Sequence, residues 1–524
     1  MMDADLTRIR QLNEIGIALS AERDHAVLLE RILSSARALT DADAGTLYTM
    51  DPAADRLDFA IVQNDTLGIH LGGPGTPVGD GFPSVALHQP DGTPNDQQVA
   101  AYAVLNDVTV NIEDAYDARG FDFSGTRRFD EATGYRSRAL LTVPMHDHEG
   151  EIVAVLQLLN KRTASGVEAF TEADRHTAES LASQAAVAIT NQRLIDGMQA
   201  LFDSFTRVIA RAIDAKSAHT GAHCRRVPAA TLMLAEAANR SDHPLLADFS
   251  LTDDDRYELS TAAWLHDCGK VVTPHHVMEK STKLEGLFDR LALIETRFAV
   301  RRQAIERSAA GDRDAQCQQL AEDLDRVRQA NRGDIPLTDE AVAELERIAA
   351  LTWTDVEGRE QPLITTDELN DLCVRRGTLN DEERRIIEGH MTATLDMLGE
   401  LPFPRHLQRV PEYAGGHHER MDGTGYPKGL TREELSLPAR MMGIADVFEA
   451  LTAPDRPYKA PMKLSQALTI MGRMVEDNHL DPDLFRVFVD EGVYREYAKA
   501  YLNEAQIDAV DPSQLPGLTA GVAP

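Results

Sequence analysis

A long stretch without helix-breaking residues constrains the fold more than any other feature of this sequence. Between Ala173 and about Ala215 there is no proline and only one glycine, Gly197. Apolar residues recur there at spacings of mostly three to five, which is typical of a helix: Leu181, Ala185, Ile189, Leu194, Met198, Leu201, Phe205, Val208 and Ile213. The sequence therefore predicts one long connecting helix over 173–215.

A helix of this length exceeds what a compact domain needs. We expect it to pair with its twin in a parallel coiled coil and to set a homodimer. The alternative is a single helix that folds back on the domain before it.

The pattern before this helix indicates a mixed α+β domain. From Leu6 to about Thr40 the apolar spacing is mostly helical and predicts two short helices. Strand-like runs follow, and the last two are separated by a polar turn at 148–151: 44–50, 57–62, 139–145 and 152–159. We predict an N-terminal helix over 1–19 and an α+β domain over 20–172.

Composition limits the partners and the compartment. A chain of 524 residues can bury two or three cores. Its formal charge of −32 argues against nucleic-acid polymers and anionic membranes as partners, because both would be repelled. The start lacks the pattern of a signal peptide and no apolar stretch approaches the length of a membrane helix, so we expect a cytoplasmic protein. The cysteines have no metal or disulfide spacing and are interpreted as reduced packing residues: Cys224, Cys268, Cys317 and Cys373.

Histidines and carboxylates after the long helix have the chemistry of a metal site. Adjacent histidines, His417 and His418, run into the glycine-rich turn Asp422-Gly423-Thr424-Gly425-Tyr426-Pro427, and a second histidine stands beside a carboxylate in His266-Asp267. With His223, His390 and Asp446 they supply the mixture that borderline divalent transition metals prefer, whereas calcium or magnesium sites are built from oxygen. A metallohydrolase is the leading hypothesis.

At these residues the chain resembles a known family. Leu265-His266-Asp267-Cys268-Gly269-Lys270, followed by the run from His417 to Pro427, is similar to the signature of the HD-GYP domain, a variant of the HD phosphohydrolases. The resemblance covers 202–505 and leaves a C-terminal tail over 506–524. It implies an all-α helical bundle that hydrolyses the bacterial second messenger cyclic di-GMP with two or three metal ions, commonly iron or manganese.

The resemblance also implies roles for individual residues. Lys270 and Asp267 would be catalytic, with Asp267 bridging two metals and Lys270, one turn later on the same helix, contacting a phosphate oxygen. Substrate contacts would come from Lys270, Gly425, Tyr426, Arg456 and Lys459. The seven expected metal ligands are His223, His266, Asp267, His390, His417, His418 and Asp446.

His219 lies four residues before His223 and so on the same helix face. Family members with three metals carry a Glu at this position. His219 could be an additional ligand, a substrate contact or a residue that hydrogen-bonds a ligand. We expect two divalent metal ions per chain rather than three.

The N-terminal domain resembles a GAF domain, the small-molecule sensor module. The similarity rests on 129–137 and on Asn160-Lys161 followed by Phe170 and Asp174. Arg175 stands where GAF domains of cyclic-nucleotide phosphodiesterases carry a Glu, which counts against cyclic-nucleotide binding. The domain would take a small molecule or a cyclic nucleotide, in a pocket whose residues the sequence does not identify. The alternative is a degenerate GAF domain that serves only as a dimerisation platform.

A segment inside the second domain departs from the family pattern. Residues 279–377 separate the Lys270 motif from His390 and include a charged helical run at 284–328, a second at 338–350 and a turn-rich stretch at 355–360. We interpret the segment as a helical insertion that projects from the bundle. Its charge favours a solvated face over a binding site.

These observations predict a multidomain protein with a GAF-like sensor, a connecting helix and an HD-GYP bundle. The first functional hypothesis is a GAF-regulated phosphodiesterase that hydrolyses cyclic di-GMP to pGpG, and the sequence leaves open whether a second cleavage gives GMP. An alternative within the enzyme class is hydrolysis of another cyclic dinucleotide, such as cyclic GMP-AMP. From a different class comes a catalytically silent cyclic-dinucleotide receptor that signals through a partner protein.

Overall fold

The computed structural model describes residues 2–51, 53–79, 81–216, 223–308, 312–453 and 461–518. The chain divides into two compact units, Met1–Leu201 and Phe202–Pro524. None of the helices in the described residues is long and apolar enough to cross a membrane.

The N-terminal unit is built on an eight-stranded sheet. Six strands follow the order β3-β2-β1-β7-β6-β5, while β4 pairs with β2 and β8 with β7, all antiparallel. The four predicted strands are confirmed as β1, β2, β6 and β7, and β6 and β7 form the predicted hairpin. The strands are β1 (Ala42–Asp51), β2 (Arg56–Asn64), β3 (Ile69–Gly72), β4 (Val85–Ala86), β5 (Val110–Ile112), β6 (Leu140–His146), β7 (Ile152–Thr163) and β8 (Gly166–Glu168).

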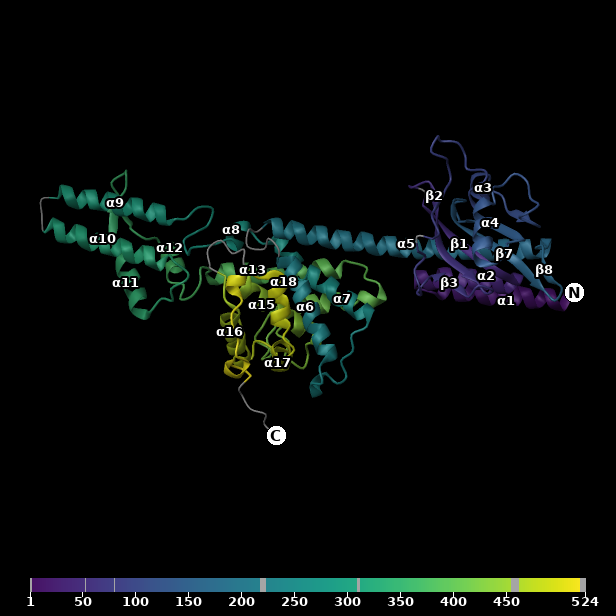
Figure 1. Cartoon of the computed structure of the whole chain (residues 1–524). Coiled ribbons are helices and arrows are strands. Elements are labelled where there is room, and N and C mark those ends of the chain that lie inside the picture. The colour runs from purple at the N-terminus through teal and green to yellow at the C-terminus, as the bar shows by residue number, and fades with distance from the viewer. Residues whose placement is uncertain are drawn as a thin grey trace. The chain divides into compact units, whose positions relative to one another are not determined.

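Alternating residues of these strands face two separate cores, because successive side chains of a strand point to opposite faces. Leu47 and Leu156 pack in one core, Tyr48 and Val155 in the other. The larger core includes residues of α2 and α5, and the smaller one residues of α3, so helices cover both faces of the sheet (Figure 1). The helices of this unit are α1 (Met2–Ala21), α2 (His25–Thr40), α3 (Val99–Leu105) and α4 (Ser124–Thr133).

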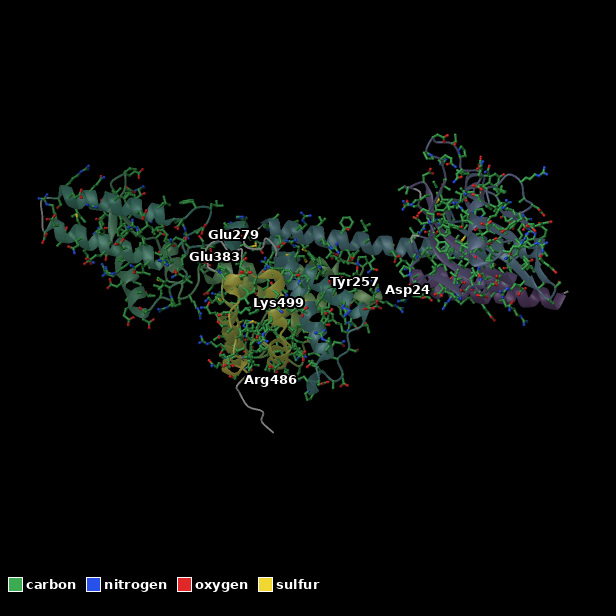
Figure 2. All side chains as sticks on the ribbon, in the orientation of Figure 1. Asp24, Tyr257, Glu279, Glu383, Arg486 and Lys499 are labelled. Carbon is green, nitrogen blue, oxygen red and sulfur yellow. The ribbon has the colours of Figure 1, made fainter. Side chains whose placement is uncertain are left out.

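The two predicted N-terminal helices are α1 and α2, and local chemistry separates them. The carboxylate of Asp24 (Figure 2) accepts hydrogen bonds from the backbone amides of Ala26 and Val27, which caps the start of α2. The helix ends at Asp41, whose φ of 55° is left-handed. Leu19 of α1 is buried in the larger core of the unit, so α1 packs as part of this domain.

The connecting helix α5 runs from Glu172 to Lys216, where the sequence predicted a helix over 173–215. Its first part buries Leu181, Ala185 and Ile189 in the larger core of the N-terminal unit. This part therefore does lie on the sheet, as the single-helix alternative supposed. Beyond Thr190 the helix exposes large apolar side chains, including Leu194 and Met198.

Apart from the insertion, the second unit is an all-α bundle around one core. Its largest fully buried side chains include Phe448, Phe488, Tyr494 and Tyr497, which contact one another ring to ring. Gln506 and Leu515, from the segment predicted as a tail, are also buried against this bundle. The bundle contains α6 (His223–Arg240), η1 (Pro244–Leu246), α7 (Asp253–Leu265), η2 (Cys268–Val272), α8 (His275–Met278), α13 (Asp381–Gly399), η3 (Arg405–Leu407), α14 (Val410–Gly415), α15 (Leu437–Thr452), α16 (Leu464–Glu476), α17 (Pro482–Asp490), α18 (Val493–Tyr501), η4 (Glu504–Gln506) and η5 (Pro512–Gln514).

The predicted insertion contains a separate small core, formed by residues such as Phe298, Val327 and Ile348. The charged run at 284–328 is two helices rather than one, and the turn-rich stretch at 355–360 lies between two short paired strands. Lys280 holds the base of the insertion through an ion pair with Glu383 (Figure 2), at the start of α13. Its elements are α9 (Leu291–Arg307), α10 (Arg313–Ala330), α11 (Asp339–Ala349), β9 (Thr352–Thr354), β10 (Glu360–Pro362) and α12 (Thr366–Leu372).

Candidate metal centre

The fold brings all seven expected metal ligands together in the second unit, although the sequence spreads them over more than 220 positions. Their ligand atoms form two groups, each with all members within 4.8 Å of one another. One group is His223, His266 and Asp267, and the other is Asp267, His390, His417 and His418. Asp446 of α15 joins the first group, with its Oδ1 3.3 Å from His223 Nε2.

Asp267 is the member that both groups share. Its Oδ2 lies 3.2 Å from Nε2 of His223 and 3.2 Å from Nε2 of His266, while its Oδ1 lies 3.4 Å from Nε2 of His390. The residue sits between the end of α7 and the start of η2 and is 2% exposed. A carboxylate in this position can bridge two metal ions.

The main chain fixes three of the imidazoles. The Nδ1 atoms of His266, His390 and His417 donate to the carbonyls of Ala263, Ile387 and Ala414, each three residues earlier. A histidine whose Nδ1 carries the proton presents an unprotonated Nε2, the tautomer that ligates a metal through Nε2. The local turns at the ends of α7 and α14 thereby orient the rings toward the shared carboxylate.

The unsatisfied atoms at the centre of the cluster fit metal ions. Asp267 Oδ1, His390 Nε2 and His417 Nε2 are buried and accept no hydrogen bond from any described residue. Buried polar atoms are rarely left without a partner, and each such atom costs about 1–3 kcal/mol. Three lone pairs converging in one place are the arrangement expected where cations complete the site.

The ionisation of the histidine doublet and of Asp446 also suits metal ligation. His223 differs, because burial lowers its pKa but its hydrogen bonds to Asp267, Asp446 and Glu449 outweigh burial and raise it. Burial lowers the pKa of His417 well below its ordinary value and that of His418 to about 4, so both rings are neutral at neutral pH. Burial raises the pKa of Asp446, but the hydrogen bond and charge of His223 outweigh it and lower the pKa. Neutral imidazole and ionised carboxylate are the states that bind a metal without losing a proton.

Lys270 lies beside the shared carboxylate, but not on the same helix as His266. The α-helix ends at Leu265, and Lys270 belongs to the following 3₁₀ turn, η2. Its ammonium donates to Asp267 Oδ2, and although burial lowers its pKa, the charges of Asp267 and Asp446 outweigh burial and raise it. Gly269 lets the turn pack closely, because a Cβ there would come within 2.0 Å of the His390 carbonyl.

The turn after the histidine doublet closes one side of the cluster. The ring of Tyr426 stacks on His418 with centroids 4.9 Å apart. Gly425 leaves no room for a side chain, since a Cβ would lie 2.4 Å from the Arg420 amide nitrogen. Buried Glu419 accepts hydrogen bonds from the backbone amides of Lys428 and Leu430 and so holds the turn in place. Three further predicted site residues lie outside the described residues: His219, Arg456 and Lys459.

Glu449 was not identified from the sequence, and it hydrogen-bonds the expected metal ligand His223. Its Oε2 accepts a hydrogen bond from His223 Nδ1, and its Oε1 accepts one from Arg226 at 2.7 Å. Glu449 is 1% exposed and follows Asp446 by one turn of α15, as Arg226 follows His223 on α6. The sequence offered one signal, the spacing of three residues that both pairs share. Such a spacing occurs on any helix and so does not identify a site.

We predict that replacing Glu449 with Gln weakens metal binding about 10–100-fold, because His223 loses the carboxylate that fixes its orientation. Metal content measured during dialysis against a graded chelator would show the change. Glu476→Gln, at an exposed position of α16, is the matched control and should bind as the wild type does. Unchanged metal affinity in Glu449→Gln would remove Glu449 from the site.

In the N-terminal unit, the motif residues Asn160, Lys161, Phe170 and Asp174 build a corner of the sheet. The Asn160 side chain accepts a hydrogen bond from the Arg138 amide and donates to the Tyr135 hydroxyl, and Lys161 is ion-paired with Asp174. A cavity of about 650 Å³ lies in the same unit, lined by residues including Tyr48, Phe59, Phe82, Tyr135 and Gln157. Among the residues that the structure describes, the four motif residues do not line it.

Comparison with known proteins assigns both units. Residues 24–189 match the family model of the GAF domain, and residues 366–484 match that of the HD domain, a family of metal-dependent enzymes. The HD match contains His390, His417, His418 and Asp446. Most of the insertion, up to residue 365, lies between this match and the other three ligands, His223, His266 and Asp267. The fold brings both sets of ligands to the same site.

Two curated relatives share part of the chain. The first is the 3'3'-cGAMP-specific phosphodiesterase 1 of Vibrio cholerae, 42% identical over 119 residues, which are 23% of this chain and 27% of the relative. The second is a cyclic di-GMP phosphodiesterase of Pseudomonas aeruginosa, 46% identical over 136 residues, 26% of this chain and 31% of the relative. The chain therefore matches less than a third of the length of each. Among solved structures, the GAF domain of a phosphoenolpyruvate-protein phosphotransferase from Coxiella burnetii is 14% identical, with a TM-score of 0.29, and the match covers 37% of this chain and 98% of that domain.

Proposed function

We propose that this chain, with its GAF domain and its HD domain, is a metal-dependent phosphodiesterase that hydrolyses cyclic di-GMP to pGpG, with GMP as the further product if pGpG is cleaved again. The observation that carries the proposal is the position of Asp267 between two groups of metal-ligating side chains, with Lys270 beside it. Two-metal sites of this kind are suited to in-line displacement at a phosphorus atom. The names of both curated relatives support a cyclic dinucleotide as the substrate class.

The site would hold two divalent ions. His223, His266 and Asp446 would bind one ion, His390, His417 and His418 the other, and Asp267 both. Iron or manganese is proposed because these imidazole-rich and carboxylate-containing sites suit borderline transition metals. A third ion would need His219 as a ligand, and we propose instead that metal analysis at saturation gives two ions per chain.

Residues of the chain would bind the substrate and stabilise the transition state. Bound metal ions would supply Lewis acidity, lowering the pKa of water and neutralising charge on the phosphodiester. The Lys270 ammonium would donate to a nonbridging phosphate oxygen and stabilise the charge that develops in the transition state. Gly425 and Tyr426 would form the wall against which the substrate lies, and Arg456 and Lys459 would add positive charge for its phosphates.

The test is a panel of cyclic dinucleotides incubated with the full chain after anaerobic loading with iron or manganese, with products separated by chromatography. Linear pGpG from cyclic di-GMP is the expected result. Faster turnover of cyclic GMP-AMP would favour the second candidate, which the Vibrio cholerae relative suggests. Binding of either nucleotide without turnover would identify a silent receptor instead.

We also propose that the chain forms a parallel homodimer through α5. The exposed side chains of Leu194, Met198, Leu201, Phe205 and Val208 follow one another at intervals of four, three, four and three residues. This is the a/d spacing of a coiled coil, and Asn191 occupies the preceding a position, where a buried asparagine fixes the register of a parallel dimer. A second copy of the same stripe would cover these apolar side chains.

The dimer prediction can be checked by solution mass. Leu201→Glu places a charge at a d position of each helix and is expected to shift the protein from twice the mass of the chain to the mass of one chain. Gln199→Glu adds the same charge at an exposed position off the stripe and should leave the dimer intact. A wild-type protein with the mass of a single chain would contradict the proposal.

The GAF domain would regulate the enzyme through this helix. We propose that a small molecule, such as a cyclic nucleotide, binds in the cavity of about 650 Å³, whose aromatic side chains can stack on a planar ring. The helix α5 begins directly after the sheet of this domain and extends to Lys216, seven positions before His223. Turnover measured with and without cyclic AMP and cyclic GMP would reveal the regulation.

A further inference from the structure

The second unit contains a groove that the proposed catalysis does not use. It has a volume of about 610 Å³ and is lined by Arg207, Arg211, Asp214 and Ala215 of α5, Arg225 of α6 and Trp264 of α7. None of the seven candidate metal ligands lines it. Three arginines and one of the two tryptophans of the chain thus meet at one place.

Among the residues that the structure describes, Arg207 and Arg211 form no ion pair, and the charge of Arg225 acts on Asp214 in the same groove. The chain has 85 acidic and 53 basic residues, and many of its arginines are ion-paired with a carboxylate. The neighbouring Arg226, for example, is paired with Glu449, and Arg256 with Glu236. Asp214 lines the groove as well and sets one carboxylate against the three guanidinium groups. The groove therefore keeps an excess of positive charge on a strongly acidic protein.

The chemistry of the lining defines the class of ligand. Guanidinium groups bind phosphate through paired N–H donors, and they do so more tightly than an ammonium can. The indole of Trp264 is partly buried against the core of the unit and offers an aromatic surface on which a planar base can stack. A ligand that uses both features carries a phosphate and a heterocyclic base.

We propose that this groove binds a nucleotide, with the phosphate on Arg207, Arg211 and Arg225 and the base on Trp264. The site is distinct from the metal centre, although it lies close to it in sequence. Arg225 follows His223 by two residues on α6, and Trp264 precedes His266 by two at the end of α7. Helix positions two apart face different sides, so the groove backs onto the segments that hold two metal ligands. The proposal is independent of the proposed function.

Tryptophan fluorescence can test the groove directly, since the chain has only Trp264 and Trp353. In a Trp353→Phe background the emission reports Trp264 alone, and Trp353 lies in the insertion. The full chain, stripped of metal by chelation, would be titrated with GMP, guanosine and inorganic phosphate. We expect saturable quenching by GMP, at least about tenfold weaker binding of guanosine, and competition by inorganic phosphate without quenching of its own.

The arginine variants decide whether the quenching belongs to this groove. Arg207→Gln and Arg211→Gln should each weaken GMP binding about tenfold, and raising the salt concentration should weaken it further. Arg473→Gln, an exposed arginine of α16 away from the lining, is the control and should bind GMP as the parent does. Equilibrium dialysis with radiolabelled GMP measures the same affinities without relying on fluorescence. Absence of GMP binding by dialysis, equal affinities for GMP and guanosine, or unchanged binding in the Arg207→Gln and Arg211→Gln double variant would each overturn the proposal.

Discussion

Replacing Asp267 with Ala is expected to abolish turnover of cyclic di-GMP. Within the described residues, Asp267 is the only carboxylate that belongs to both groups of ligands. The variant removes it from beside the Nε2 atoms of three histidines. The rate of a two-metal reaction that loses its bridging ligand should fall by at least about 10³-fold. Losing a main electrostatic contribution to a transition state has an effect of this size. Steady-state hydrolysis with metal-loaded protein measures the effect.

Two controls separate loss of chemistry from loss of structure. Circular dichroism of Asp267→Ala should keep the helical signal, because Asp267 contributes no apolar side chain to the hydrophobic core of the bundle. Asp490→Ala removes a carboxylate from an exposed position at the end of α17 and should hydrolyse as the wild type does. Full activity in a metal-replete Asp267→Ala protein would rule out the two-metal site.

Lys270→Gln is expected to lower kcat about 10²–10³-fold while leaving both metal ions bound. The substitution removes the ammonium that lies against Asp267 and would contact the phosphate, yet it deletes no metal ligand. The measurement pairs kcat with the metal content of the same sample. Lys499→Gln, at an exposed position of α18 (Figure 2), removes an equal charge from the same unit and serves as the matched control.

The two parts of this result carry different information. A fall in kcat with two metals retained would support a direct role for Lys270 in the transition state. A fall accompanied by metal loss would instead assign Lys270 to holding Asp267 in place. Unchanged kcat would exclude both roles.

Features that depend on one segment of the chain could be predicted from the sequence, whereas contacts between distant residues could be predicted only where a family motif pointed to them. The strands containing Leu47 and Leu156 could be found because a short apolar run next to turn residues is a signal within one segment. The start of α2 also depends on one segment, since the Asp24 side chain caps the helix by accepting hydrogen bonds from the amides of Ala26 and Val27. The position of Asp267 could be anticipated only through the family motif, because its partners His223 and His390 lie 44 and 123 positions away.

Contacts between residues far apart in the sequence were missed where no family motif pointed to them. Glu449 meets His223 across 226 positions, and only the packing of α15 against α6 makes them neighbours. Lys270 was expected on the helix of His266, but α7 ends at Leu265, and a tighter turn carries the lysine instead. The separate core of the insertion was also missed, because its buried residues, such as Phe298 and Leu345, are few among many charged ones.

The groove of Arg207, Arg211, Arg225 and Trp264 could not be predicted either. Arginines at such spacing on a helix usually form a solvated face, and no sequence pattern shows that three of them meet Trp264 in one groove. The packing of α5, α6 and α7 determines that they surround one space.

The central claim is that the metal centre around Asp267 hydrolyses cyclic di-GMP. The most direct measurement is single-turnover hydrolysis of cyclic di-GMP by the full chain, first stripped of metal and then titrated with iron or manganese under anaerobic conditions. We predict no product without metal and formation of linear pGpG that rises to a plateau at two ions per chain. A protein that binds two ions per chain and leaves cyclic di-GMP intact, or that cleaves it equally well without metal, would contradict this account.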